Sequence, residues 1–291
     1  MTESILVSAI KNCNYATFAF LHLPLMKTLT LLIFLLAFVM LTNGQDRYFA
    51  RTYTANVLAK GGIDLELWHT SRFGHSKQFF HAMDQRMELE VGLGSRLQTA
   101  LYFNRFQKTF SDSTGEMVNK TEAGFSNEWK WQLNKPTIKG INVALYAELG
   151  IKGDELELET KFIADKAFGN NLVAFNLVYE QEHEFERENG KTALVLAATP
   201  VEFDLAYMHY IKPQFGLGVE VVNKNDIIKG VRNNSLLFAG PSINYRGNSW
   251  FVIANYLPQL VNLKRTASYP LSTDLFDHEK AEVRILFGIS L

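Results

Sequence analysis

From residue 62 to residue 291, apolar and polar residues alternate with a period of two. One such row reads Met87, Leu89, Val91 and Leu93 against Arg86, Glu88, Glu90 and Gly92. Because successive side chains of a β-strand point to opposite faces, this period is typical of strands whose two faces meet different surroundings. No segment in this part of the chain shows a convincing helical period. The pattern therefore predicts an all-β fold.

The alternating rows divide into twelve predicted strands, at residues 62–71, 83–94, 97–107, 124–134, 139–151, 155–166, 171–183, 192–211, 215–225, 235–246, 249–261 and 279–291. Pro200 interrupts the strand at 192–211, because proline cannot donate a ladder hydrogen bond. We therefore expect either a bulge or a division there, and a division would change the strand count.

The predicted links between strands alternate in length. Short links such as 135–138 and 212–214 lie between longer ones such as 108–123 and 262–278. Bacterial barrels have short periplasmic turns and longer outer loops, so a closed antiparallel barrel with both ends on the periplasmic side is predicted. Its first and last strands should pair, with Glu66 near Arg284, and residues 45–61 should form a periplasmic segment ahead of the barrel.

A targeting signal precedes the alternating rows. Lys27 is followed by an apolar run from Thr28 to Leu41 and then by Thr42-Asn43-Gly44, which predicts a secretory signal peptide cleaved near Gly44. The leader is therefore residues 1–44, with Met26 as an alternative start and residues 1–25 as an upstream extension. A membrane anchor through 18–41 is the competing interpretation.

Composition limits the remaining possibilities. The chain has 291 residues, 47% of them hydrophobic, and a formal net charge of −1, which fits one sizeable domain and gives no reason to expect nucleic acid as a partner. The single cysteine, Cys13, lies in the predicted leader, so no disulfide or thiolate metal site is expected in the mature protein. Residues 62–291 are thus predicted to form the whole barrel.

Alternation alone does not say which face of the barrel is apolar, and a soluble lipocalin-like barrel would place the apolar rows inside. A ring of twelve strands is too wide for one layer of aliphatic side chains to fill. Aromatic residues also flank the predicted turns, as Tyr245 and Trp250 do, which is typical of a membrane interface. The apolar rows are therefore predicted to face lipid, as in a transmembrane β-barrel.

The terminal segment Val283-Arg284-Ile285-Leu286-Phe287-Gly288-Ile289-Ser290-Leu291 resembles the last strand of Gram-negative outer-membrane β-barrels, although Leu291 departs from the usual terminal aromatic residue. The stretch 68–93 is similar to a group of uncharacterised outer-membrane barrels, some of which resemble transporters of the phenol-degradation (MetA-pathway) type. These resemblances imply a location in the outer membrane, contact with its lipid, and insertion by the barrel-assembly machinery.

If the apolar rows face lipid, the opposite rows line the lumen and are predominantly acidic. The predicted lumen-lining residues are Arg86, Glu88, Glu90, Glu128, Lys130, Glu148, Glu157, Glu159, Lys161, Glu202, Asp204, Glu220, Glu282 and Arg284. Rings of carboxylates attract cations, so we expect a pore or transporter for small solutes with an acidic polar lumen. Alternatively, these side chains form networks that fill the lumen of a plugged structural or interaction barrel.

Other candidate chemistry is weaker, and no cofactor, metal site or enzymatic activity is predicted. His69, His75 and His81 recur at intervals of six, but no carboxylate spacing supports a metal site. His69-Thr70-Ser71 resembles the His-x-Ser spacing of outer-membrane phospholipase A, which would make His69 a base and Ser71 a nucleophile. Arg72 and Phe73 depart from that family, so a lipid-acting enzyme remains a third alternative.

Overall fold

The computed structural model describes residues 47–75, 78–135, 140–188, 191–264 and 278–291. The predicted signal peptide at 1–44, together with Cys13, lies outside the described residues. Among the described residues, none forms a helix with the length and apolar character needed to cross a membrane.

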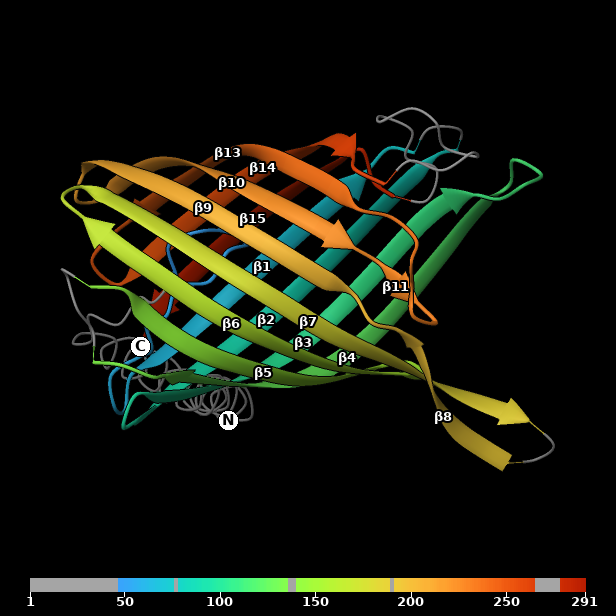
Figure 1. The fold of residues 1–291 in the computed structure, drawn as a ribbon, viewed down its shortest axis with the longest axis horizontal. Coiled ribbons are helices and arrows are strands. Elements are labelled where there is room, and N and C mark those ends of the chain that lie inside the picture. The colour runs from blue at the N-terminus through green and yellow to red at the C-terminus, as the bar shows by residue number, and fades with distance from the viewer. Residues whose placement is uncertain (1–46, 76–77, 136–139, 189–190, 265–277) are drawn as a thin grey trace, which may run out of the picture. The chain divides into compact units, whose positions relative to one another are not determined.

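Twelve antiparallel strands form a closed ring within the described residues (Figure 1). In ring order they are β1 (Ile63–Phe73), β2 (Phe80–Gly94), β3 (Leu97–Ser111), β4 (Met117–Gln132), β5 (Asn142–Lys152), β6 (Glu155–Phe168), β7 (Asn171–Glu188), β9 (Val201–Lys212), β10 (Phe215–Asn225), β13 (Leu236–Arg246), β14 (Trp250–Asn262) and β15 (Ala281–Ser290). Pairing of β1 with β15 closes the sheet, so the prediction of a closed antiparallel barrel is confirmed.

Pro200 does divide the predicted strand at 192–211, yet the ring keeps twelve strands. The first piece, β8 (Lys191–Ala198), pairs with the far half of β7 and forms a hairpin that projects beyond the barrel (Figure 1). The second piece, β9, begins at Val201 and pairs with the first half of β7, from Asn171 to Tyr179. Our expectation that a division would change the count is therefore wrong, because only β9 belongs to the wall.

The two short strands β11 (Ile227–Ile228) and β12 (Val231–Arg232) form a small hairpin beside β8, where Ile228 pairs with Ala198. The predicted long loop at 108–123 is also wrong in extent. Strands β3 and β4 continue as a ladder to Ser111 and Met117, and Asp112 closes the turn by accepting hydrogen bonds from the backbone N–H groups of Thr114 and Glu116.

The register of closure differs from the predicted one. Glu66 lies opposite Gly288, and Arg284 lies opposite Thr70. The first and last strands pair as expected, but the register is shifted by four residues from the predicted one. Alternation fixes which face a side chain occupies and leaves shifts by an even number of residues undetermined.

The two ends of the barrel differ. The connections from β2 to β3, β4 to β5, β6 to β7, β9 to β10 and β13 to β14 lie at one end, which we call the turn end, and β1 begins there. The other connections lie at the opposite end, which we call the loop end. At the turn end, Gly94, Ser95 and Arg96 have positive φ angles of 86°, 53° and 66°, which allows the tight reversal between β2 and β3.

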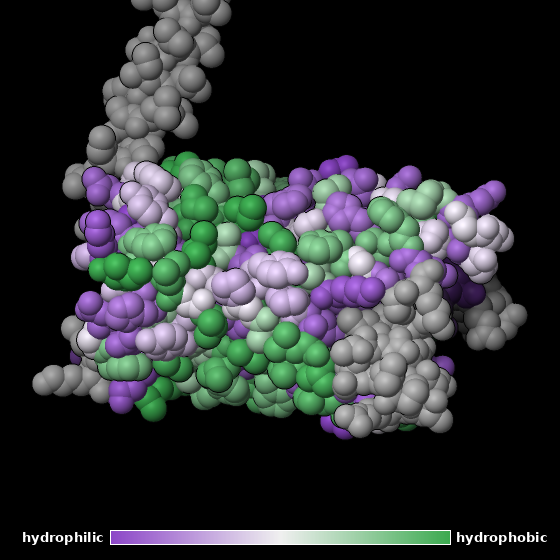
Figure 2. Space-filling model, turned by 90° about the horizontal axis from the view of Figure 1, so that it is seen from above, coloured by the Kyte–Doolittle hydropathy of each residue, from purple (hydrophilic) through white to green (hydrophobic). Residues whose placement is uncertain are grey.

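The two faces of the wall have opposite chemical character. Outward side chains are apolar and exposed, as Leu89 (38%) and Ile285 (45%) are, whereas their neighbours Glu88 and Glu282 are buried inside the barrel. Figure 2 shows hydrophobic side chains over much of the wall and hydrophilic ones gathered toward its ends. A closed barrel satisfies its own backbone hydrogen bonds, so this apolar outer face can contact lipid.

Residues 47–61 lie inside the barrel, and we call this segment the plug. Arg47, Phe49, Ala50 and Tyr53 of the plug are each at most 3% exposed. We predicted that this stretch would lie outside the barrel as a periplasmic segment, so its position is a correction. Alternation carries no information about a coil that wall side chains hold in place.

Candidate functional site

The predicted lumen residues all lie on the inner face of the wall, at two levels. Those around the plug are Glu88, Glu90, Glu128, Lys130, Glu148 and Glu220, each at most 7% exposed. Those around a cavity between the plug and the loop end are Arg86, Glu157, Glu159, Lys161, Glu202, Asp204, Glu282 and Arg284.

Glu220 of β10 holds the tip of the plug. Its carboxylate accepts hydrogen bonds from the backbone N–H groups of Ala50 (3.2 Å), Arg51 (2.9 Å) and Thr52 (2.9 Å). Three successive N–H groups that point at one anion form an anion-binding concavity of the backbone. Asn255 of β14 donates a further hydrogen bond to the same carboxylate, which fixes its orientation.

The return arm of the plug is held by side chains of the opposite wall. Asn176 of β7 accepts a hydrogen bond from the N–H of Tyr53 and donates one to its carbonyl group. Further toward the turn end, the N–H of Ala55 donates to Asp165, and the N–H of Leu58 donates to Gln98. The wall thus supplies polar partners that the coiled backbone of the plug does not find within itself.

Arg51 joins the plug to two distant strands. Its guanidinium group lies 2.6 Å from the carboxylate of Glu202 on β9 and 3.2 Å from that of Glu282 on β15. In the ring, β10, β13 and β14 separate these two strands. Arg51 therefore forms a bridge across the lumen between wall strands that do not touch each other.

Arg47 lies deeper, among carboxylates and aromatic rings. Its side-chain nitrogens lie 3.7 Å from Glu66 and 3.8 Å from Glu88, and its guanidinium carbon lies 3.5 Å from the centre of the Tyr53 ring. Trp68 provides a second ring at 4.4 Å. A cation that lies against aromatic faces and beside carboxylates gains attraction from both.

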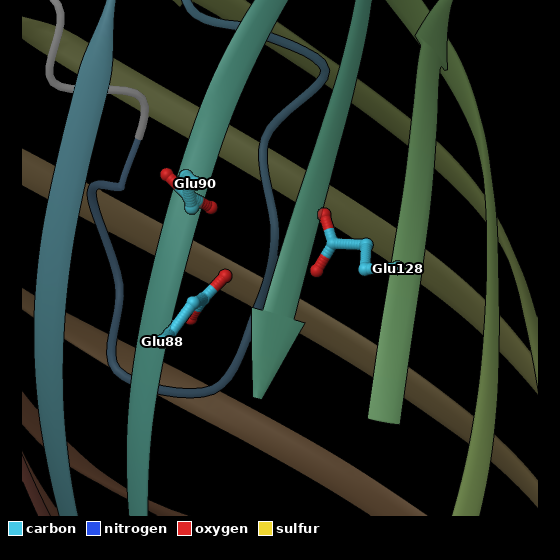
Figure 3. Close-up of side chains that lie close together, drawn as sticks. All are labelled: Glu88, Glu90 and Glu128. Carbon is cyan, nitrogen blue, oxygen red and sulfur yellow. The ribbon is translucent and has the colours of Figure 1, made fainter. Parts of the chain in front are cut away.

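Glu88, Glu90 and Glu128 converge beside the plug, and Figure 3 shows their side chains turned toward one another from β2 and β4. One oxygen from each lies within 4.8 Å of the others. Gln98 donates a hydrogen bond to Glu90, and Tyr102 donates one to Glu128. An all-oxygen set suits a hard cation, and here the guanidinium group of Arg47 supplies positive charge next to Glu88.

A cavity of about 240 Å³ lies on the loop side of the plug, and Arg51 and Tyr53 of the plug line it. Its other charged lining residues are Arg72, Asp84, Arg86, Glu157, Glu159, Lys161, Glu180, Glu202, Asp204, Lys224, Glu282 and Arg284. Trp68 and Thr70 complete the lining. The lining of this cavity therefore carries charges of both signs, whereas the sequence led us to expect a predominantly acidic one.

Three of the basic lining residues were absent from the predicted set, and each has a traceable reason. Arg51 belongs to the plug, which the sequence led us to place ahead of the barrel and not in its lumen. Arg72 lies just beyond the predicted strand 62–71, in a stretch predicted to be a loop. Lys224 lies at the loop-end limit of the predicted strand 215–225. The predicted lumen holds more carboxylates than basic side chains, and buried carboxylates need cationic partners. This imbalance could have indicated that basic residues from elsewhere in the chain enter the lumen.

The alternative site at His69 and Ser71 is not assembled as predicted. The Ser71 hydroxyl forms its hydrogen bond, at 2.7 Å, with Nε2 of His81 on the neighbouring strand. His69 lies opposite Gln85 in the ladder. His75 stacks on Phe80 with ring centres 4.0 Å apart, and no histidine enters a group of potential metal ligands among the described residues.

Comparison with solved structures places this fold among the outer-membrane β-barrels. The chain is similar to the COG4313 outer membrane channel from Pseudomonas putida F1, with 9% identity, a TM-score of 0.56, and coverage of 81% of this chain and 98% of that one. It is also similar to the β domain of the Bordetella autotransporter BrkA, with 10% identity, a TM-score of 0.54, and coverage of 80% and 100%. At these identities the likeness concerns the fold.

Residues 42–291 match the model of a family of unknown function, DUF6662, so the chain belongs to that family. No curated protein sequence matches it.

Proposed function

We propose that this protein is an outer-membrane pore for small polar solutes, and that the plug closes its resting lumen. The observation that carries the proposal is the polar cavity between the plug and the loop end. A barrel with a purely structural role has no need of a cavity lined by charged groups of both signs, whereas a solute path requires polar walls.

The way in which the plug is held also supports a plug that can move. Its polar contacts with the wall are hydrogen bonds and ion pairs to side chains such as Glu220, Asn176 and Glu202, and they lie beside two apolar clusters that hold Phe49 and Tyr53 of the plug. Each of these partners can exchange to water or to a solute at a small net cost. At the base of the plug, the backbone pairs with the wall directly: Gly61 donates a hydrogen bond to the carbonyl group of Gly92.

Single-channel recording in planar bilayers tests this proposal, with Gly92→Ala as a variant that disturbs the plug. A Cβ atom at Gly92 would lie 2.0 Å from the carbonyl oxygen of Ala59, so the base of the plug must shift. We expect brief openings of the native protein and a higher open fraction in the variant. Gly150→Ala is the matched control, because its nearest neighbour would be 3.4 Å away.

A second candidate function is a permanently plugged barrel whose loops alone act. The burial of Arg47, Phe49 and Tyr53 favours it, because these side chains fill the lumen at the level of the plug. The two candidates differ in one measurement. If the native protein and Gly92→Ala both fail to conduct, and neither takes up solute in liposomes, the structural role stands and the pore is excluded.

Finer features of the proposal follow from the sequence. We propose a location in the outer membrane and insertion by the barrel-assembly machinery, which would bind the terminal strand β15. The acidic wall rows favour cations over anions. Residues 68–93 resemble a group of outer-membrane barrels, some of which resemble transporters of the phenol-degradation type, so we include phenol as an additional solute in uptake assays. The lipid-acting alternative would require phospholipid turnover that is lost in Ser71→Ala.

A further inference from the structure

Three carboxylates in the cavity differ from the rest because no cationic side chain of the described chain lies within 4.0 Å of them. These are Glu157, Glu180 and Asp204. The other acidic lining residues are paired: Asp84 with Arg72, Glu159 with Lys161, Glu202 with Arg51, and Glu282 with Arg51 and Lys224. The cavity therefore has unmatched negative charge at defined positions.

The three unmatched carboxylates lie beside other carboxylates of the cavity lining. Glu157 on β6 lies diagonally across from Glu180 on β7, and Asp204 lies two residues from Glu202 on β9. Neighbouring carboxylates repel each other, so a cation between them would be stabilising. Asp204 is only 2% exposed, and its Oδ1 atom accepts no hydrogen bond from the described residues.

The strand register adds to this repulsion. On the inner faces of β6 and β7, Glu159 lies opposite Glu180 and Glu157 lies opposite Glu182. Like charges at directly opposed positions destabilise an antiparallel pair. The arrangement therefore has a structural cost that an added cation would offset.

We propose that the cavity binds a small organic cation, with a primary ammonium group seated between Glu157 and Glu180. This inference rests on the proposed function and names the class of solute for that pore. An ammonium group carries three N–H donors, so it can donate to both carboxylates at once and offset their mutual repulsion.

The size and lining of the cavity favour an organic cation over a bare metal ion. A volume of about 240 Å³ has room for about eight water molecules, and so for an amine of several non-hydrogen atoms. A metal ion such as Ca²⁺ needs six to eight oxygen ligands at short range. Glu157 and Glu180 offer few such atoms, and Lys161 and Arg86 lie on the same lining.

Isothermal titration of the purified, folded barrel in detergent tests this site, with 1,4-diaminobutane as the probe. We expect saturable binding of the diamine and none of 1,4-butanediol, which has the same length without charge. Calcium chloride serves as the metal probe.

Glu157→Gln with Glu180→Gln should weaken diamine binding by about tenfold or more, because each amide replaces an ion pair by a neutral contact. Glu184→Gln is the matched control, since Glu184 lies on the same strand as Glu180 and is exposed outside the cavity lining. Glu180→Gln alone provides a milder variant if the double variant does not fold.

Three outcomes would overturn the site: no saturable binding of the diamine, equal binding of the diol, or calcium binding in place of the diamine. Full retention of binding in both glutamine variants would also overturn it. These results are separate from the pore itself. A barrel that conducts without binding the diamine loses only this inference, whereas a barrel that binds the diamine without conducting loses the pore.

Discussion

Arg51 is the residue on which the closed state of the lumen depends most directly. Its guanidinium group is 17% exposed and bridges Glu202 on β9 and Glu282 on β15. Buried or nearly buried ion pairs contribute little net free energy when complete, but loss of one partner leaves an uncompensated charge. The side chain therefore acts as a latch whose removal affects both the plug and the wall.

Arg51→Gln should lower the free energy of unfolding by about 3 kcal/mol and increase the open fraction of the pore. The first effect arises because Glu202 and Glu282 remain in the lumen without their cation. Urea unfolding followed by tryptophan fluorescence and single-channel recording measure the two effects. Arg105→Gln on the exposed outer face is the control, and equal stability of the two variants would contradict the role of the latch.

At the scale of single residues, the sequence predicted the positions of wall side chains but not those of plug side chains. The alternation of Leu89 with Glu90 was sufficient to assign each to a face, because a strand leaves only two choices. No comparable rule assigns Arg47 or Arg51, whose positions depend on carboxylates that come from strands far away in the sequence. The lumen residues could be identified from the sequence, whereas their ion-pair partners in the plug could not.

At the scale of single elements, β2 offers the sharpest test of which face meets lipid. Leu89 is 38% exposed on the outer face, and Glu90 is buried beside Gln98. Leu89→Arg should cost about 2–4 kcal/mol if the residue lies near the bilayer midplane, whereas Glu90→Gln keeps an oxygen acceptor and should be tolerated. The fraction of folded barrel in each variant can be measured by cold gel electrophoresis. A larger loss of folded barrel in Glu90→Gln than in Leu89→Arg would show that the two faces are assigned the wrong way round.

The segment before β15 should respond to acid. Burial alone would raise the pKa of Glu279, but Lys224 and Arg72 outweigh burial and lower the pKa to about 2. Since the pKa is lower in the folded state than in the unfolded state, the ionised group stabilises the fold above about pH 4.3 and loses this contribution as the pH falls toward 2. The size of the effect is roughly 3 kcal/mol.

Hydrogen exchange of the backbone at residues 278–281 should therefore be slow at pH 5 to 7 and accelerate below about pH 4, after correction for the intrinsic exchange rate. Glu279→Gln should remove the pH dependence and show fast exchange throughout. A pH profile identical in the native protein and the variant would show that Lys224 does not anchor this segment.

The length of elements was predicted less well than their existence. Strands β3, β4 and β7 run beyond the predicted ends, because a ladder outside the membrane needs no apolar row on one face. Pro200 illustrates the opposite case. Its missing donor was correctly identified as a break, yet only the three-dimensional pairing of β7 with both β8 and β9 shows that the ring count is unaffected.

At the scale of the whole molecule, the barrel and the plug share one interior, in which ion pairs and hydrogen bonds lie beside apolar clusters. Deletion of residues 47–60 should leave a barrel that closes, because the ring is made by strand pairing. It should conduct continuously and be less stable, because Glu220, Asp165 and Glu202 lose the partners that the plug supplies. Planar-bilayer conductance and thermal unfolding test this, and a deleted form as poorly conducting as the native one would contradict a closing role for the plug.

The bridge from Arg51 to Glu282 also constrains the order of events when the protein is made. The two residues are 231 positions apart, and β15 is the last strand of the ring. The latch therefore cannot form until the final strand has been added, however early residue 51 emerges. Before β15 joins the ring, Arg51 can pair with Glu202 on β9 but not with Glu282, so the plug gains its full set of ion pairs only in the finished barrel.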